Sequence, residues 1–173
     1  MRYYIADTHF FHRSLNEKMD QRGFEDIEQM NEYMIDQWNS KVRKNDEVVV
    51  LGDFSWGNAS QTTEILDELK GKIYLIRGNH DRFLDDKNFD ASRFVWIKDY
   101  AELNENKRKV VLSHYPIACY NGQYRRDEDG NPKTFMLHGH IHATQDQQFL
   151  DAYQEYICLL YTSDAADDRI SVD

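Results

Sequence analysis

Residues that could bind metal ions recur along the chain, and several of them follow directly after a short apolar segment. Imidazole and carboxylate groups together suit first-row divalent ions such as Mn, Fe, Zn or Ni. One carboxylate can also bridge two ions about 3.5–4 Å apart, which is the spacing of two-metal hydrolytic sites. Five of the seven histidines belong to these motifs. The motifs are Asp7-x-His9, Gly52-Asp53, Gly78-Asn79-His80-Asp81, Ser113-His114 and Gly139-His140-Ile141-His142.

The five motifs are weak one by one and specific as an ordered set. A lone Gly52-Asp53 pair is almost meaningless, whereas four specified residues after an apolar strand, as in the motif that ends at Asp81, are a stronger signal. Neither Cys119 nor Cys158 belongs to a CxxC pair, so a closed structural zinc site is not the natural interpretation. Two divalent ions against two carboxylates and one hydroxide leave a positive centre, which favours an anionic substrate.

The elements that must position these motifs alternate between strands and helices. Apolar residues spaced three and four apart from Ile27 to Val42 predict one helix, and Ser60 can cap a second helix that runs to Lys70. Ligands of open α/β sheets collect beyond the carboxyl ends of the strands, so motifs distant in sequence can converge there. A glycine precedes several candidate ligands, which indicates tight turns or close backbone approach. We expect strands at 2–6, 47–51, 72–77, 93–98, 109–112 and 134–137, a turn at 104–108 and a long loop at 115–133.

The composition is that of an ordinary globular domain, with 173 residues of which 40% are hydrophobic and 30% charged. No apolar run reaches membrane-spanning length, and the first strand begins at once, so we expect a cytoplasmic protein with no targeting segment and no membrane partner. Two distant cysteines fit a reducing compartment. The net charge of −10 argues against broad binding to an extended nucleic-acid duplex.

With these motifs in this order, the sequence resembles the calcineurin-like metallophosphoesterase superfamily. It is most similar to the small bacterial and phage phosphoesterases of that group. The resemblance covers residues 1–157 as a single domain. It implies an α/β fold, a four-layer α/β/β/α sandwich of two mixed sheets, with a dinuclear metal site at its edge.

The resemblance also implies roles for the site residues. Asp53 would bridge two divalent ions, with Mn as the first expectation. A hydroxide between the ions would attack the phosphorus, and His80 would donate a proton to the leaving oxygen. One ion would be held by Asp7, His9, Asp53 and His142, and the other by Asp53, Asn79, His114 and His140.

The last sixteen residues, 158–173, differ from the rest of the chain. They show no clear amphipathic pattern after Tyr161, and they resemble the translated sequencing adapters found at the ends of metagenomic reading frames. We expect them to be an atypical tail of non-native sequence. The family usually closes its second sheet with a strand near residues 154–159, which such a tail would leave incomplete.

Several residues beside the motifs have two interpretations each. His12 and Arg22 could contact the substrate phosphate, since arginine forks onto phosphate oxygens, or they could belong to a solvated loop. Asp81 could orient His80 or cap the segment that follows it. Trp56 could shape the rim of the site or fill the core.

Three functions are open at this point. The first is a phosphoesterase for a small phosphorylated substrate, either a phosphodiester such as a cyclic nucleotide or a phosphomonoester. The second is a catalytically disused scaffold for protein binding, of which the retromer subunit of the superfamily is an example. The third is a structural metal protein, against which the mixed Asp, Asn and His set argues. The complete ligand set and the retained His80 favour the enzyme.

Overall fold

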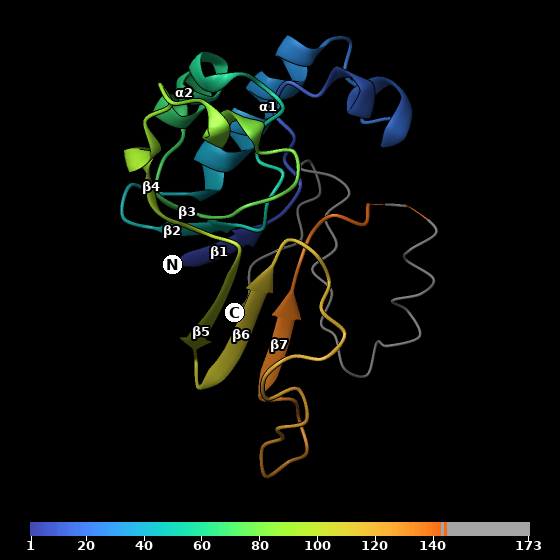
Figure 1. The fold of residues 1–173 in the computed structure, drawn as a ribbon, viewed down its shortest axis with the longest axis vertical. Coiled ribbons are helices and arrows are strands. Elements are labelled where there is room, and N and C mark those ends of the chain that lie inside the picture. Colours follow the sequence, from blue (N-terminus) through green and yellow to red (C-terminus); the bar gives the residue numbers. More distant parts are fainter. Residues whose placement is uncertain (143, 145–173) are drawn as a thin grey trace.

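Two β-sheets and a layer of helices make up the fold, shown in Figure 1 as a computed structural model that describes residues 1–142 and 144. Helices α1 (Ile27–Lys41) and α2 (Ala59–Glu68) form the helical layer. Three short helical turns are η1 (Leu15–Met19), η2 (Arg82–Asp85) and η3 (Ala91–Arg93). The strands are β1 (Arg2–Ile5), β2 (Glu47–Val50), β3 (Lys72–Ile76), β4 (Phe94–Lys98), β5 (Tyr100–Glu105), β6 (Arg108–Ser113) and β7 (Thr134–Leu137).

Strands of both sheets end at the same edge of the molecule. The first sheet has the order β1-β2-β3-β4, and its described strands are all parallel. The second has the order β5-β6-β7, with β5 antiparallel to β6 and β6 parallel to β7. The expected α/β fold with two sheets is confirmed. Among the described strands, the second sheet is mixed and the first is parallel.

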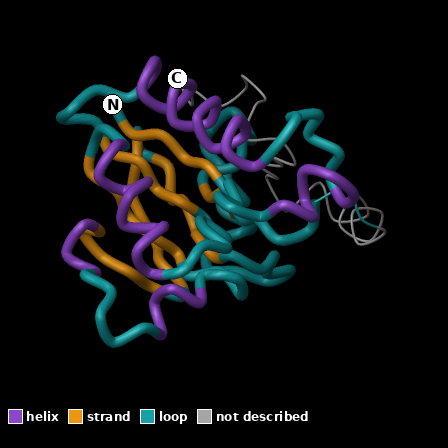
Figure 2. The backbone as a smooth tube through the Cα atoms, turned by 90° about the horizontal axis from the view of Figure 1, so that it is seen from above, coloured by secondary structure: helices purple, strands orange, loops and turns teal. Residues whose placement is uncertain are grey.

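Alternating side chains of the central strand β2 explain the layers. Val48 and Val50 pack into a cluster with residues of α1 and α2. Val49 and Leu51 point the other way, into a cluster with Leu112 and other residues of the second sheet. A strand buried on both faces reads as a continuous apolar run, as this one does. Figure 2 shows the helices lying over the strands of the first sheet.

The second helix begins earlier than the sequence suggested. Asn58, rather than Ser60, is its N-cap, and it accepts a hydrogen bond from the backbone of Gln61. The Gln61 side chain in turn accepts from the backbone N–H of Asn58, so the two residues form a capping box. The reciprocal pair satisfies two otherwise free N–H groups, and this favours Asn58 over a serine two residues later.

One strand and three short helical turns were not predicted. Residues 104–108 were expected as a turn, but β5 extends to Glu105, and only Asn106 and Lys107 turn the chain, both with positive φ. The alternation Ala101, Leu103 was a signal for this strand that the interpretation missed. The helical turns are η1, a five-residue π-helix between β1 and α1, and the shorter 3₁₀ turns η2 and η3.

Some expectations concern residues that lie outside the described ones. The closing strand near 154–159 and the atypical tail at 158–173 belong to this part of the chain.

Within the described part, the outer face of the second sheet carries a small cluster that includes Val111, Tyr120 and Met136. No helix among the described residues is long and apolar enough to span a membrane.

The packing between the sheets gives a first prediction. Val49 is 0% exposed, and its replacement by alanine removes two buried carbons and leaves a cavity. We expect V49A to lower the free energy of unfolding by about 2 kcal/mol. The matched variant V95A, at a residue 54% exposed on β4, should change it by less than about 0.5 kcal/mol. Urea unfolding of both variants measures the difference, and equal effects would contradict the assignment of Val49 to the core.

Candidate metal centre

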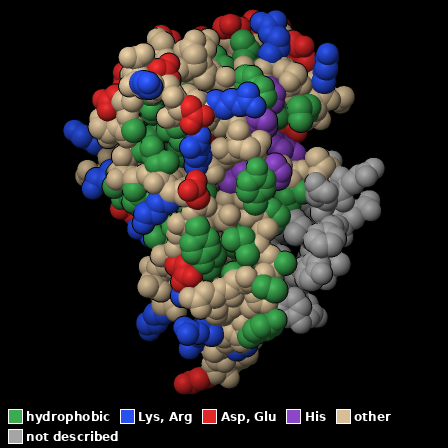
Figure 3. Space-filling view, viewed as in Figure 1, with side chains coloured by type: hydrophobic (Ala, Val, Ile, Leu, Met, Phe, Trp, Pro, Cys, Tyr) green, Lys and Arg blue, Asp and Glu red, His purple; other side chains and the backbone are tan. Residues whose placement is uncertain are grey.

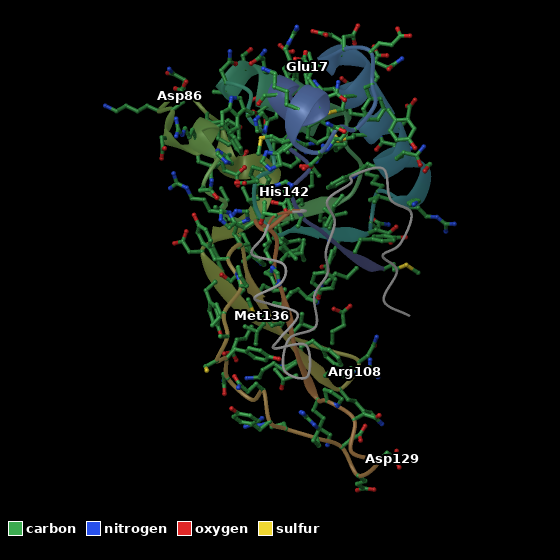
Figure 4. All side chains as sticks on the ribbon, turned by 90° about the vertical axis from the view of Figure 1, so that its right-hand side faces the viewer. Glu17, Asp86, Arg108, Asp129, Met136 and His142 are labelled. Atoms are coloured by element: carbon green, nitrogen blue, oxygen red, sulfur yellow. The ribbon has the colours of Figure 1, made fainter. Side chains whose placement is uncertain are left out.

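Side chains from both sheets meet at one edge of the molecule, beyond the carboxyl ends of β1, β2, β3, β6 and β7. Two groups of potential ligand atoms lie there, and the atoms of each group are within 4.8 Å of one another. Figure 4 shows His142 at the junction of the two sheets, while Asp129 lies at a far tip of the molecule. The first cluster is Asp7, His9 and His142, and the second cluster is Asp53, His114 and His140.

Asp53 lies between the two clusters. Its Oδ2 atom is 3.5 Å from Nε2 of His9 in the first cluster and 3.4 Å from Nε2 of His114 in the second. Its Oδ1 atom accepts a hydrogen bond of 2.8 Å from the backbone of His80, which limits rotation of the carboxylate. Asn79 adjoins the second cluster, since its Oδ1 lies 3.0 Å from Nε2 of His114. One carboxylate oxygen therefore faces both clusters.

The backbone is strained at the residues of both clusters. Positive φ is uncommon in residues other than glycine and costs on the order of 1–2 kcal/mol. Hydrogen bonds between the loops hold this conformation, for example from the backbone of His9 to the carbonyl of Asp53 at 2.9 Å. Such strain gathers at functional sites. The φ angles are 53° at Asp7, 49° at His9, 52° at Asp53, 77° at His140 and 47° at His142.

Two positions next to the candidate ligands have room only for glycine. A Cβ atom on Gly78 would collide with the backbone nitrogen and carboxylate of Asp53. A Cβ atom on Gly139 would lie 2.5 Å from Oδ2 of Asp7, closer than real contacts allow. The close backbone approach inferred from the glycines of the motifs is therefore confirmed at these two positions.

Asp81 fixes the loop that carries the shared carboxylate. Its Oδ1 accepts from the backbones of Phe54 (2.7 Å) and Ser55 (3.3 Å), and its Oδ2 accepts from those of Asp53 (3.1 Å) and Gly78 (2.8 Å). Burial raises the pKa of Asp81 to about 6, although these bonds act to lower it. Neither expected role, orienting the preceding histidine or capping η2, is seen in its hydrogen bonds.

Hydrogen-bond partners on their outer nitrogens orient two of the histidine rings toward the clusters. A metal binds the unprotonated nitrogen of a neutral imidazole, and the other nitrogen then carries the proton. In His114 this outer nitrogen, Nδ1, lies 2.9 Å from the carbonyl oxygen of Leu51 and donates to it. In His9 it lies 3.2 Å from Nδ1 of His12, whose Nε2 is 3.0 Å from Oγ of Ser14. The Nε2 atoms of both rings face the clusters, which is the orientation that a metal ligand needs.

Burial and neighbouring charges set the ionisation of the donors. Burial lowers the pKa of His9 to about 2, so this ring is neutral at pH 7. Burial raises the pKa of Asp7 to about 6. Burial also acts to raise the pKa of Asp53, but its hydrogen bond and charge interaction with His114 outweigh this and lower it to about 2. A charged Asp53 beside a neutral His9 is a suitable donor set for cations.

A cavity of about 450 Å³ opens over the clusters, a size that suits a small ligand. His80 lines it, with a side chain 29% exposed and its Nε2 4.0 Å from Oδ2 of Asp53. Trp56 is 46% exposed, stacks on the ring of His12 at 4.1 Å and lies 4.4 Å from that of His80. The tryptophan thus lies near the rim rather than in the core. Figure 3 shows histidine side chains gathered on this face of the molecule.

The two residues predicted to contact the substrate phosphate are tied to the clusters. His12 is 5% exposed and adjoins both His9 and the cavity. The Arg22 side chain is 1% exposed, and its guanidinium donates to the carbonyl oxygens of Asp7 (2.9 Å) and Thr8 (2.8 Å). Their contact with a substrate stays a prediction. Because both side chains are buried, neither belongs to a solvated loop.

The sequence interpretation missed Asp20. This residue follows η1, and its Oδ2 lies 3.2 Å from Nδ1 of His142, which is 122 positions further along the chain. No motif spacing links residues so far apart, so the contact required the tertiary structure. A usable signal was its position two residues before Arg22, which the sequence analysis had considered for contact with the substrate phosphate.

The fold and the paired clusters define the class of protein: an α/β protein of two sheets with a candidate site for two metal ions at the carboxyl ends of its strands. The chain matches the calcineurin-like phosphoesterase family over residues 3–168, and it belongs to that family. The family resemblance inferred from the motifs is thus confirmed. Members of this family are typically metal-dependent hydrolases.

Similar proteins include an archaeal protein, a phage protein and a bacterial protein of known structure. The chain is 36% identical to an uncharacterized protein of Methanocaldococcus jannaschii, over 87% of this chain and 72% of that protein. It is 29% identical to the Gene 66 protein of a Mycobacterium phage, over 82% of this chain and 78% of the phage protein. A crystal structure of an Aquifex aeolicus protein of unknown function has the same fold, with a TM-score of 0.66 and 21% identity over 94% of this chain and 90% of that one.

The role of Asp81 gives a stability prediction. Replacing Asp81 with alanine leaves four backbone N–H groups around it without their acceptor. We expect D81A to lower the free energy of unfolding of the metal-free protein by at least about 3 kcal/mol, because each buried unsatisfied donor costs about 1–3 kcal/mol. The control D85A removes a carboxylate whose side chain is 64% exposed, and it should have little effect. Chemical denaturation measures both, and a small change in D81A would show that the four bonds are replaceable.

Proposed function

We propose that the protein hydrolyses esters of phosphate in small molecules, using two divalent metal ions held by the two clusters. The supporting observation is the position of Asp53, whose Oδ2 lies within 3.5 Å of ligand nitrogens from both clusters. A structural metal site is usually closed and tetrahedral and has no need of a second cluster that shares a carboxylate. A cavity over both clusters also favours a site that receives a substrate.

The residues of the site would divide between two ions, with Mn as the first expectation. When bound, the ions would supply a nucleophile from water near neutral pH and polarise the phosphoryl oxygens. The protein fixes the ligands in advance through strained loops and through the hydrogen bonds on the outer nitrogens of the rings. Asp7, His9, Asp53 and His142 would hold one ion, and Asp53, Asn79, His114 and His140 the other.

His80 is the proposed proton donor to the leaving oxygen. Its Nε2 is the ring nitrogen near Oδ2 of Asp53, at 4.0 Å, and the side chain reaches the cavity. Burial lowers the pKa of His80, while the charge of Asp53 acts to raise it. A bound phosphoester adds further negative charge, which favours the protonated ring. Nε2–H can then donate its proton as the ester bond breaks.

The charge and the size of the site favour a small anionic substrate. The net charge of −10 opposes the approach of a long nucleic-acid duplex, whereas two bound ions would attract one phosphoester locally. The alternative of a disused scaffold is disfavoured, because the full ligand set and His80 are both present. Both a phosphodiester and a phosphomonoester fit the proposal.

A direct assay tests the proposed activity. Metal-free protein is reconstituted with Mn, Ni, Zn or Mg and assayed with bis-p-nitrophenyl phosphate beside p-nitrophenyl phosphate. We expect hydrolysis that requires added metal and is abolished by EDTA, with Mn among the activating ions. The ratio of the two rates separates a phosphodiesterase from a phosphatase. Absence of hydrolysis of both esters with every metal would contradict the proposal.

A substitution tests the role of His80. We expect H80N to lower kcat by about 100-fold to 10,000-fold, the usual contribution of a positioned general acid. The variant should still bind two Mn ions, because His80 belongs to neither cluster. Steady-state kinetics and metal analysis by plasma emission measure the two effects. Unchanged kcat would exclude His80 as the proton donor, and loss of metal would assign it a ligand role instead.

A further inference from the structure

The segment from Asp20 to Arg22 contacts both parts of the chain that carry the first cluster, the loop after β1 and the segment at His142. Arg22 donates to the carbonyl oxygens of Asp7 and Thr8, which belong to the backbone leading to the ligand His9. The Arg22 side chain is 1% exposed, so these bonds are shielded from water. Arg22 therefore fixes this segment against the loop that follows β1.

Asp20 contacts His142, the member of the first cluster that comes from the C-terminal part of the described chain. Its side chain is 6% exposed, and its Oδ2 lies 3.2 Å from Nδ1 of His142. Nε2 of His142 lies on the cluster side of the ring, 3.1 Å from Nε2 of His9 and 3.8 Å from Oδ1 of Asp7. In the neutral ring that binds a metal, a proton on Nδ1 that is donated to Asp20 leaves Nε2 unprotonated and directed at the cluster.

The outer partners of the cluster histidines differ in charge. His114 of the second cluster donates to the neutral backbone carbonyl of Leu51, and the outer nitrogen of His9 faces the ring of His12. The outer nitrogen of His142 faces a carboxylate. A carboxylate on the outer nitrogen fixes the tautomer and orientation of a ligating ring and makes its other nitrogen more basic.

We propose that Asp20 is a positioning residue that sets the metal affinity of the first cluster by holding His142, with Arg22 anchoring the segment. This inference rests on the proposed two-metal function. The ion of the first cluster depends on Asp20, and the ion of the second cluster, whose His114 is held by a backbone carbonyl, does not. Asp20 also adds negative charge on the side of the first ion, which strengthens the attraction for a cation.

A purely structural role for Asp20 is the competing explanation. Its ion pair with Arg22, at 3.5 Å between Nη2 and Oδ2, is longer than the two bonds that Arg22 makes to backbone carbonyls. Arg22 therefore stays anchored when the carboxylate is removed. Loss of Asp20 should act on His142 first, and not on the fold as a whole.

Metal titration of variants tests the inference. Metal-free wild type, D20N and D20A are titrated with Mn²⁺ in a calorimeter. We expect two ions in the wild type and, in D20A, a 10-fold to 100-fold weaker affinity for one of the two ions. D20N, whose amide oxygen still accepts a hydrogen bond but lacks the charge, should lie between the two. The control E17Q removes one charge from η1, where the Glu17 side chain is 50% exposed, and should match the wild type.

A second measurement needs no metal. NMR of protein labelled with ¹⁵N-histidine reports which ring nitrogen carries the proton. At alkaline pH, where the ring is neutral, we expect the Nδ1–H form of His142 in the metal-free wild type and a mixture of tautomers in D20A. The melting temperature of the metal-free variants shows whether the fold is intact.

The outcomes separate this inference from the proposed function. Unchanged affinity for both ions in D20A, or an unchanged tautomer of His142, overturns the role of Asp20 even when the wild type is an active two-metal phosphoesterase. Equal weakening of both ions with a lower melting temperature overturns it in favour of a structural role. A wild type that binds no Mn²⁺ overturns the proposed function, and this inference with it.

Discussion

The carboxylate of Asp53 is the point on which the arrangement of the site depends. One of its oxygens faces histidines from both clusters, and the other accepts the backbone N–H of His80. Because His9 follows β1 and His114 follows β6, this carboxylate relates the two sheets to each other at the site. The proposed bridging role would allow little displacement, since metal–ligand distances vary by only about 0.2 Å. The surrounding structure must therefore hold Asp53 rigidly.

Much of the structure near the site serves this rigidity. Asp53 has a positive φ angle of 52°, and its loop is fixed by three backbone hydrogen bonds to Asp81. Gly78 leaves the space that the carboxylate occupies. Below the loop, β2 is buried on both faces, by helices on one side and by the second sheet on the other. Burial and hydrogen bonds together thus stabilise the strained backbone at the candidate ligands.

The strands and the longer helices could be predicted because their signals are local. Apolar runs and helical spacing placed β1, β2, β3, β7 and α1 close to their observed bounds. The start of α2 was misplaced because Ser60 and Asn58 are both good capping residues, and only the partner Gln61 decides between them. The π-helix η1 has no periodic pattern. It is held in place by contacts such as the two hydrogen bonds between Asn16 and Phe24, so the spacing of residues did not predict it.

The sequence by itself determined which residue types stand after each strand, and hence the family and the candidate ligands, because the order and spacing of those motifs are local properties of the chain. Only the tertiary structure decided how these residues are supported. Asp81 was expected to act on its neighbours in sequence, but it holds the backbone of another loop. Arg22 holds carbonyls next to the ligands, and Asp20 reaches His142 across most of the chain. Buried polar groups take whichever partners the fold brings within hydrogen-bonding distance, and sequence spacing does not specify those partners.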